Sequence, residues 1–397
     1  MIKMTALLAA VGALLLLYAS GVLAQPETPT QKIPDRYIVV FEDDVQRPAA
    51  VANEHARENG LQLKFVYSNA IEGYAAVFPN DRALQRVQND PRVDYIEQDQ
   101  VVRAIAQTLP WGIDQIDADI SSTKAGDGGL DPTKNMISNV NAYIIDTGIY
   151  KHTDLNVVNH VNFRGDGKNY DCNGHGTHVA GTVAAKDNDQ DVVGVAPEDP
   201  LIGVKVLGCS GSGSTSGVIA GVNWVTQNAA KPAIANMSLG GGVSQAEEDA
   251  VRKSASSGVF YSIAAGNNGA NACNYSPSRA GRTRNADGTW NKDNGVTTVA
   301  ATNKKDEETS WSNYGPCVDI WAPGYSILST RKGGGTTTMS GTSMAAPHVG
   351  GGGALYLSSH ASANTSTTEI ALKGAAKTPG TKSKNGDSIM LEYVGGF

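Results

Sequence analysis

The sequence predicts an α/β domain built on a parallel sheet flanked by helices, preceded by a small α+β domain. Short apolar runs that alternate with longer helix-compatible stretches predict the larger domain. Polar residues framed by glycines directly follow some of these runs. An order of strand, helix, strand, strand, helix, strand before residue 102 predicts the smaller domain. The 397-residue chain has room for both, because domains commonly hold roughly 50 to 250 residues.

Residues 1–24 have the pattern of a secretory signal peptide. Lys3 precedes an apolar run at 6–18, and small or apolar residues at 22–24 stand before the expected cut. A single membrane anchor is the alternative, but the run is shorter than the roughly 20 residues that span a bilayer. We therefore predict that residues 1–24 are removed and that the protein is secreted and extracellular.

Residues 25–105 form the expected small domain, with its core at 34–102. Its pattern is a split βαβ unit resembling a ferredoxin-like fold. No cysteine and no glycine-framed polar cluster occurs in it. A small binding module is one interpretation, and a pro-region is the other. The expected strands lie at 36–41, 63–67, 74–78 and 93–97, and the expected helices at 49–59 and 81–88.

Residues 106–397 form the expected α/β domain. Buried parallel strands are predicted at four apolar runs, 142–145, 201–207, 233–238 and 259–265. In such sheets the functional groups gather at the carboxyl ends of the strands. Asp146 and Asn267 each follow one of these runs, so both are candidate site residues.

Composition excludes several classes of protein. The 45 glycines show no regular period, which excludes a collagen-like repeat. The net charge of −7 is spread along the chain, so nothing indicates a nucleic acid or a membrane surface as a partner. Secretion favours disulfides over metal ligation for the four cysteines, and three pairings are possible. They are Cys172, Cys209, Cys273 and Cys317.

Three residues supply the groups of a nucleophilic site. Asp146 opens D-T-G, His175 stands in N-G-H-G-T-H, and Ser343 stands in G-T-S-M-A. A serine hydroxyl becomes a good nucleophile when a histidine takes its proton, and that histidine needs a carboxylate to hold its tautomer. The three lie far apart in the chain, so the fold must bring them together. Their order differs from the order in α/β-hydrolases.

His178 follows His175 by one turn, which could suggest a pair of metal ligands. Neither the H-E-x-x-H spacing nor a third ligand accompanies the pair. We therefore interpret His178 as a packed structural histidine.

These motifs, with A-A-G-N at 264–267, resemble the subtilisin-like serine proteases. P-W-G at 110–112, N-Y-S-P at 274–277 and S-N-Y-G at 312–315 are most similar to the proteinase K and aqualysin branch. The resemblance implies a serine endopeptidase acting on protein and peptide substrates. It also implies that residues 25–105 are an inhibitory propeptide and folding aid, which the enzyme itself cuts near 104–106. A monomer is expected.

The resemblance also assigns roles to single residues. Asn267 would stabilise the oxyanion of the tetrahedral intermediate together with the Ser343 backbone N–H. Substrate would lie as a strand between two edges, with the residue before the cut bond in a small-walled pocket that suits apolar or aromatic side chains. The edges are Gly211, Ser212 and Gly213, and Ser238, Leu239 and Gly240; the pocket residues are Ala264, Ala265, Gly266 and Tyr275.

Disulfides and calcium are implied in the same way. The resemblance pairs Cys172 with Cys209 and Cys273 with Cys317. It suggests structural calcium at Asp319 and a second site at Asp114 and Asp117, because hard oxygen ligands suit this ion. Solvated surface acids are the alternative interpretation. No cofactor is expected for catalysis.

The chain departs from the family pattern at three places, one of which, Ala346 where threonine is common, is expected to be tolerated. Residues 278–294 look like an insertion beside the expected pocket. Four glycines at 350–353 replace residues that favour helix, at a cost of about 1 kcal/mol per glycine relative to alanine, and we expect them to soften the helix that follows Ser343. Two functional alternatives therefore stay open: a catalytically inactive binding protein with the same fold, and a secreted esterase.

Overall fold

The structure is a computed structural model that describes residues 32–42, 44–100, 107–127, 138–284 and 290–397. The chain divides into two compact units, with the boundary after Ala104. The expected signal peptide and the expected cut at 104–106 lie outside the described residues.

The N-terminal unit packs two helices against a four-stranded antiparallel sheet of order β2-β3-β1-β4. The side chain of Asn80 caps the second helix by accepting a hydrogen bond from the Ala83 N–H at 3.0 Å. The expected order of strands and helices is confirmed. The elements are β1 (Lys32–Phe41), α1 (Pro48–Asn59), β2 (Gln62–Ser68), β3 (Glu72–Val77), α2 (Asp81–Gln88) and β4 (Val93–Gln100).

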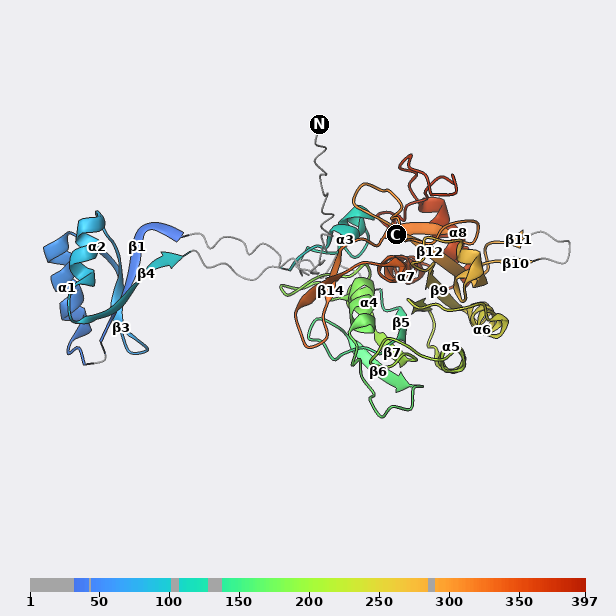
Figure 1. The fold of residues 1–397 in the computed structure, drawn as a ribbon, viewed down its shortest axis with the longest axis horizontal. Helices are drawn as coiled ribbons and strands as arrows, with labels where there is room; N and C mark the ends of the chain where they lie inside the picture. The colour runs from blue at the N-terminus through green and yellow to red at the C-terminus, as the bar shows by residue number, and fades with distance from the viewer. Residues whose placement is uncertain (1–31, 43, 101–106, 128–137, 285–289) are drawn as a thin grey trace, which may run out of the picture. The chain divides into compact units, whose positions relative to one another are not determined.

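The C-terminal unit is built on a seven-stranded parallel sheet of order β13-β12-β9-β8-β5-β7-β6 (Figure 1). The four expected apolar runs are four of its strands, β5, β7, β8 and β9. Both faces of the sheet are covered, which explains why these runs are continuously apolar. The strands are β5 (Asn141–Asp146), β6 (Val157–Asn162), β7 (Leu201–Lys205), β8 (Ala233–Met237), β9 (Val259–Ala264), β12 (Val296–Thr302) and β13 (Ile320–Pro323).

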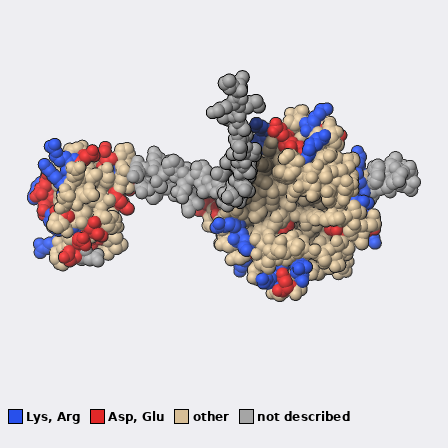
Figure 2. All heavy atoms as spheres, in the orientation of Figure 1, with Lys and Arg blue, Asp and Glu red and all other residues tan. Residues whose placement is uncertain are grey.

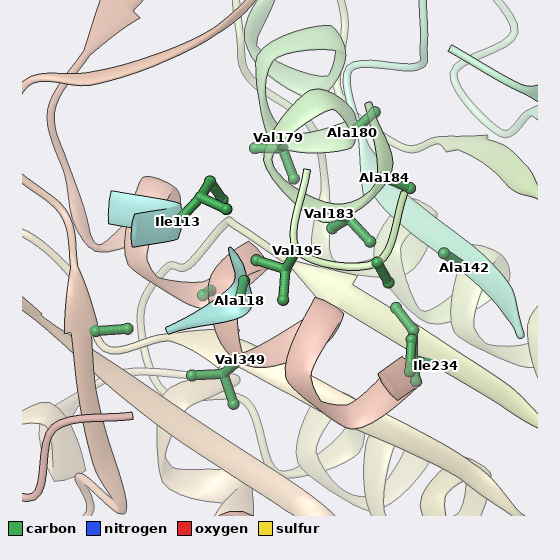
Figure 3. Packing of buried hydrophobic residues seen from close by; sticks show 14 of the residues in the cluster. Ile113, Ala118, Ala142, Val179, Ala180, Val183, Ala184, Val195, Ile234 and Val349 are labelled. Carbon is green, nitrogen blue, oxygen red and sulfur yellow. The ribbon is translucent and has the colours of Figure 1, made fainter. Parts of the chain in front are cut away.

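Alternate residues of β5 belong to different cores. Ala142 and Ile144 pack with α4 and α7 on one face of the sheet, in the layer that Figure 3 shows. Tyr143 and Ile145 pack with α5 and α6 on the other face. The helices of this unit are α3 (Trp111–Gln115), α4 (His175–Ala184), α5 (Thr215–Asn228), α6 (Gln245–Ser256), α7 (Thr342–Ser359) and α8 (Thr365–Ala375).

Short elements surround this sheet. In the described part of this unit, two β-hairpins and three 3-10 turns lie outside the sheet, and the expected insertion at 278–294 contains one of each (Figure 1). The turns are η1 (Ala118–Ile120), η2 (Ala272–Asn274) and η3 (Ser278–Gly281). The hairpins are β10 (Thr283–Arg284) with β11 (Trp290–Asn291), and β14 (Ile327–Thr330) with β15 (Thr336–Met339).

Two disulfides join loops of the C-terminal unit. Cys172 is bonded to Cys209 and Cys273 to Cys317, with Cα atoms 4.9 and 5.3 Å apart. Of the three pairings that the sequence allowed, this is the one that the resemblance implied.

The surface carries charges of both signs. On the visible face of each unit, basic and acidic side chains are scattered among wide uncharged areas (Figure 2). Within the described residues, no helix is both long and apolar enough to cross a membrane.

The four glycines at 350–353 lie inside α7, which is continuous and buried along most of its length. A methyl group on Gly351 would lie 2.5 Å from the Val195 Cβ, and one on Gly353 would lie 2.6 Å from the Phe260 ring. The glycines therefore let α7 approach the sheet closely. Packing compensates for their poor helix propensity, a reason for them that the sequence pattern did not reveal.

We predict that Gly351→Ala destabilises the protein. Alanine favours helix by about 1 kcal/mol, but the clash with Val195 should cost roughly 1–3 kcal/mol. Gly374→Ala in α8 is the matched control, because nothing lies within 4 Å of the methyl group there, and it should stabilise. Equilibrium unfolding in urea measures both changes. A Gly351→Ala protein more stable than the wild type would contradict the packing argument.

Candidate active site

Asp146 and His175 form a buried pair at the carboxyl end of β5. Asp146 is the last residue of this strand, and its side chain is fully buried. His175 is the first residue of α4, and its Nδ1 lies 2.9 and 3.0 Å from the two carboxylate oxygens. The Thr147 N–H donates to Asp146 Oδ1 at 2.6 Å. The carboxylate can therefore hold the imidazole with Nδ1 protonated and Nε2 facing away.

A glycine lets the first turn of α4 come this close to β5. A Cβ on Gly176 would overlap the Gly148 carbonyl oxygen and lie 3.1 Å from the Asp146 Cβ. Asp171 caps the same turn, since it accepts the N–H groups of Gly174 at 2.8 Å and Thr177 at 3.0 Å. Together these contacts position His175.

The pKa of His175 reflects two opposing effects. Burial disfavours the charged ring and would lower the pKa, but attraction to Asp146, the hydrogen bond to it and attraction to Asp171 outweigh burial. The net result is a pKa above the ordinary value for histidine. The carboxylate thus prepares this ring to accept a proton.

Ser343 is the second residue of α7, beside the same edge of the sheet. Its Oγ donates to the Ser238 carbonyl oxygen at 3.3 Å. Among the described residues it makes no hydrogen bond to His175, so the structure joins only the aspartate and the histidine directly. Ser343 and His175 line two adjoining cavities that share Leu239, Gly240 and Gly241. In enzymes without substrate such contacts are often long and tighten only in the complex.

Two hydrogen-bond donors lie beside the Ser343 hydroxyl: the side-chain amide of Asn267 and the backbone N–H of Ser343 itself. The Asn267 Oδ1 accepts from the Thr342 N–H at 2.8 Å and from its hydroxyl at 2.9 Å, so Nδ2 stays available. The Ser343 N–H is in the first turn of α7 and has no acceptor within the described part of the chain. This pair can stabilise a developing negative charge.

The first cavity has a volume of about 370 Å³ and opens beside Ser343. All four residues that the resemblance placed in the first pocket line it. Gly241, Asn268, Ser278 and Thr342 also line the cavity and were not anticipated. Ser278 begins the expected insertion, which therefore adjoins this cavity.

The second cavity, on the His175 side, has a similar volume of about 370 Å³. Both expected substrate edges line it: Gly211, Ser212 and Gly213, and Ser238, Leu239 and Gly240. The structure thus brings the two edges together. Glu247 of α6 also lines this cavity, and no motif in the sequence singled it out.

Two further charged residues, Asp171 and Lys205, form hydrogen bonds with Thr147 beside the site. The sequence analysis did not identify either of them. Asp171 accepts a hydrogen bond from the Thr147 hydroxyl at 2.9 Å. The buried Lys205, at the end of β7, donates to the Thr147 carbonyl at 2.8 Å. The sequence could have indicated Asp171, because an aspartate just before N-G-H-G-T-H is a typical helix cap. It gave no such indication for Lys205, because a lysine at the end of an apolar run usually marks only the end of the strand.

The other candidate ligands lie apart from this site. His178 is buried and its Nε2 contacts the Ile327 carbonyl at 3.0 Å, as expected for a structural histidine. Burial lowers the pKa of His178 to about 4. Asp319 is 7% exposed, and one of its oxygens accepts the Thr298 N–H. Asp117 forms an ion pair with Lys377, and Asp114 is exposed.

Comparison with known proteins gives consistent matches. Residues 139–395 match the model of the subtilase family, and residues 36–104 match that of peptidase inhibitor I9. An alkaline serine exoprotease A from Vibrio alginolyticus is 40% identical over 91% of this chain and 67% of its own length. An extracellular serine proteinase from Thermus sp. (strain Rt41A) is 42% identical over 86% and 85%.

A solved structure matches as well. The crystal structure of a cold adapted subtilisin-like serine proteinase superposes with a TM-score of 0.61 at 40% identity, over 72% of this chain and 97% of that chain.

We predict that the pKa of His175 falls when Asp146 becomes asparagine. The substitution removes the attraction that raises the pKa and leaves the burial that lowers it, so the pKa should drop below the ordinary value of about 6.5. Nuclear magnetic resonance of the ring in a Ser343→Ala background, with and without Asp146→Asn, measures the shift. Equal titration in both proteins would show that the pair is not coupled.

Proposed function

Since the chain belongs to the subtilase family of serine proteases and carries an N-terminal inhibitor I9 propeptide, we propose that it is a secreted, self-processed endopeptidase. The proposed catalytic residues are Ser343, His175 and Asp146. The observation that carries this assignment is the contact of His175 with the buried Asp146 at 2.9 Å, next to the cavity that Ser343 lines. A buried carboxylate beside an imidazole is the arrangement that general-base catalysis requires.

The first step forms an acyl-enzyme. Ser343 Oγ leaves the Ser238 carbonyl and attacks the substrate carbonyl, and His175 Nε2 takes its proton. Asp146 stabilises the imidazolium without taking the proton itself. The tetrahedral intermediate collapses when His175 gives the proton to the leaving amine. Water then repeats the sequence on the ester and releases Ser343.

Asn267 Nδ2 and the Ser343 N–H donate to the oxyanion in both steps. The hydroxyl of Thr342 fixes the amide of Asn267 by donating to its Oδ1 at 2.9 Å, so the donor is oriented before substrate binds. Removal of one such donor from a subtilase raises the barrier by roughly 2.7–4 kcal/mol.

Substrate binding uses backbone and pocket together. The edges at 211–213 and 238–240 face the second cavity and can pair with an extended peptide, which gives affinity with little dependence on side chains. The first cavity takes the residue before the cut bond. Alanine and glycine walls leave room for a large apolar or aromatic side chain, and Tyr275 adds an aromatic surface.

We predict that the Ser343→Ala precursor stays uncut, because the propeptide is removed by this same site. Expression of wild type and variant, followed by mass determination, tests self-processing. A fluorophosphonate probe should label the wild type only. Correctly cut chain from the variant made alone would contradict self-processing, and an unlabelled wild type would favour an inactive binding protein. Hydrolysis of esters without hydrolysis of casein would favour an esterase.

Structural calcium at Asp319 is a further part of this proposal. Its carboxylate is buried, and burial raises its pKa, so a bound cation would favour the ionised form. Backbone oxygens near Pro277 would supply further hard ligands. Asp114 and Asp117 are weaker candidates, because Asp117 already pairs with Lys377.

We predict that calcium raises the midpoint of thermal unfolding of the wild type but not of Asp319→Asn. An ion at a hundred times its dissociation constant stabilises the folded state by about 2.7 kcal/mol. Differential scanning calorimetry of the inhibited enzyme, with calcium or with chelator, measures the effect. Asp249→Asn, at an exposed acid of α6 that is no proposed ligand, is the matched control and should respond as the wild type does. An unchanged midpoint in the wild type would remove calcium from the proposal.

A further inference from the structure

The second cavity contains one buried acid, Glu247. This residue is 4% exposed, yet it lines the cavity together with His175 and both substrate edges. Within the described residues its carboxylate accepts no hydrogen bond and forms no ion pair. A buried carboxylate without a partner is costly and uncommon in native proteins. Its position on the cavity wall leaves the Glu247 carboxylate able to pair with a cationic group that enters the cavity.

Helix capping does not account for Glu247. Ser244 is the N-cap of α6 and Glu247 is its third residue, the S-x-x-E pattern of a capping box. One half of the box forms, since the Ser244 hydroxyl accepts the Glu247 N–H at 3.3 Å. The other half does not, because the Ser244 N–H donates to the Ser276 hydroxyl at 2.9 Å instead. The carboxylate of Glu247 therefore does not accept the Ser244 N–H and takes no part in the cap.

No cation among the described residues neutralises Glu247. The nearby polar groups pair with the adjacent Glu248 instead. Its carboxylate forms ion pairs with Arg279 at 3.0 Å and Arg252 at 3.3 Å and accepts a hydrogen bond from the Ser276 hydroxyl at 2.5 Å. No lysine or arginine is among the described residues that line the cavity, and α5, which faces α6, has no charged residue in its sequence. The other titratable group that lines the cavity is His175.

In the free enzyme Glu247 can be either protonated or ionised. Burial, helped by repulsion from Glu248, raises the pKa of Glu247 to about 7. The first turn of a helix favours an ionised carboxylate. Glu247 can therefore change charge near neutral pH.

We propose that Glu247 makes the second cavity a subsite for a lysine or arginine that lies two to four residues before the cut bond. In an extended peptide held between the two edges, side chains alternate between two faces, so one or two of these three positions can direct a side chain toward the second cavity while the residue before the cut bond occupies the first. A basic side chain long enough to reach Glu247 supplies the missing charge partner. The aliphatic part of that side chain packs on Leu207 and Val218, which also line the cavity.

This inference rests on the proposed function, and a set of quenched peptides separates the two. The peptides share an aromatic residue before the cut bond and carry lysine, norleucine or glutamate at one of the three preceding positions. Norleucine keeps the chain of lysine without its charge. At pH 9 the wild type should have a kcat/KM roughly ten-fold or more higher for lysine than for norleucine at one position. This preference should decrease as pH falls through about 7.

Two variants identify the residue responsible. Glu247→Gln should remove the preference, so that the ratio of kcat/KM for lysine over norleucine falls to about one at the position where the wild type discriminates. Asp249→Asn is the matched control, since it removes one charge from the same helix at a residue that does not line the cavity, and it should keep the preference. Fluorophosphonate titration gives the fraction of folded, active enzyme in each sample.

The outcomes separate the two ideas. Equal rates for lysine and norleucine at all three positions in the wild type, or an undiminished preference in Glu247→Gln, would overturn the role of Glu247 and leave the protease intact. No hydrolysis of any peptide by labelled enzyme would overturn the proposed function itself, and with it this inference.

Discussion

The site depends on a buried carboxylate at the end of a parallel strand. Asp146 has no exposure to solvent, so its charge must be compensated by groups that the fold places there. His175 and the Thr147 N–H provide hydrogen bonds to it. This contact is possible only because Gly176 has no side chain. The interaction therefore constrains the approach of α4 to the sheet, and the packing of α4 against α7 transmits that constraint to Ser343.

Charged residues beneath the site restrict its movement. Thr147 links them, since its hydroxyl bonds to Asp171 and its carbonyl accepts from Lys205. Asp171 also caps α4, so the strand end and the helix that carries His175 share one buried acceptor. Satisfied buried networks of this kind fix a single geometry, whereas a partly satisfied one is costly. Preorganisation of this site thus comes from polar contacts as well as from the apolar cores.

Much of this arrangement could be predicted from the sequence, for identifiable reasons. Strands buried on both faces give continuous apolar runs, so β5, β7, β8 and β9 were visible, and Asp146 and Asn267 at their ends followed from the geometry of parallel sheets. Lys205 and Glu247 could not be recognised, because each is a single charged residue whose role depends on contacts distant in sequence. The packing role of the glycines in α7 could not be recognised for the same reason: helix propensity is local, and the close approach to Val195 is not.

The first turn of α6 connects the two cavities. Glu248 is held by Arg279 and the Ser276 hydroxyl, which flank the wall of the first cavity near Tyr275 and Ser278. Glu247, the residue before it, points to the second cavity. Adjacent residues of a helix point in different directions, so Glu248 pairs with groups of the scaffold while Glu247 lines the second cavity. The pairing of Glu248 also has an electrostatic consequence: the arginines that satisfy it are unavailable to Glu247. The same turn that stabilises one subsite therefore leaves an unpaired charge in the other.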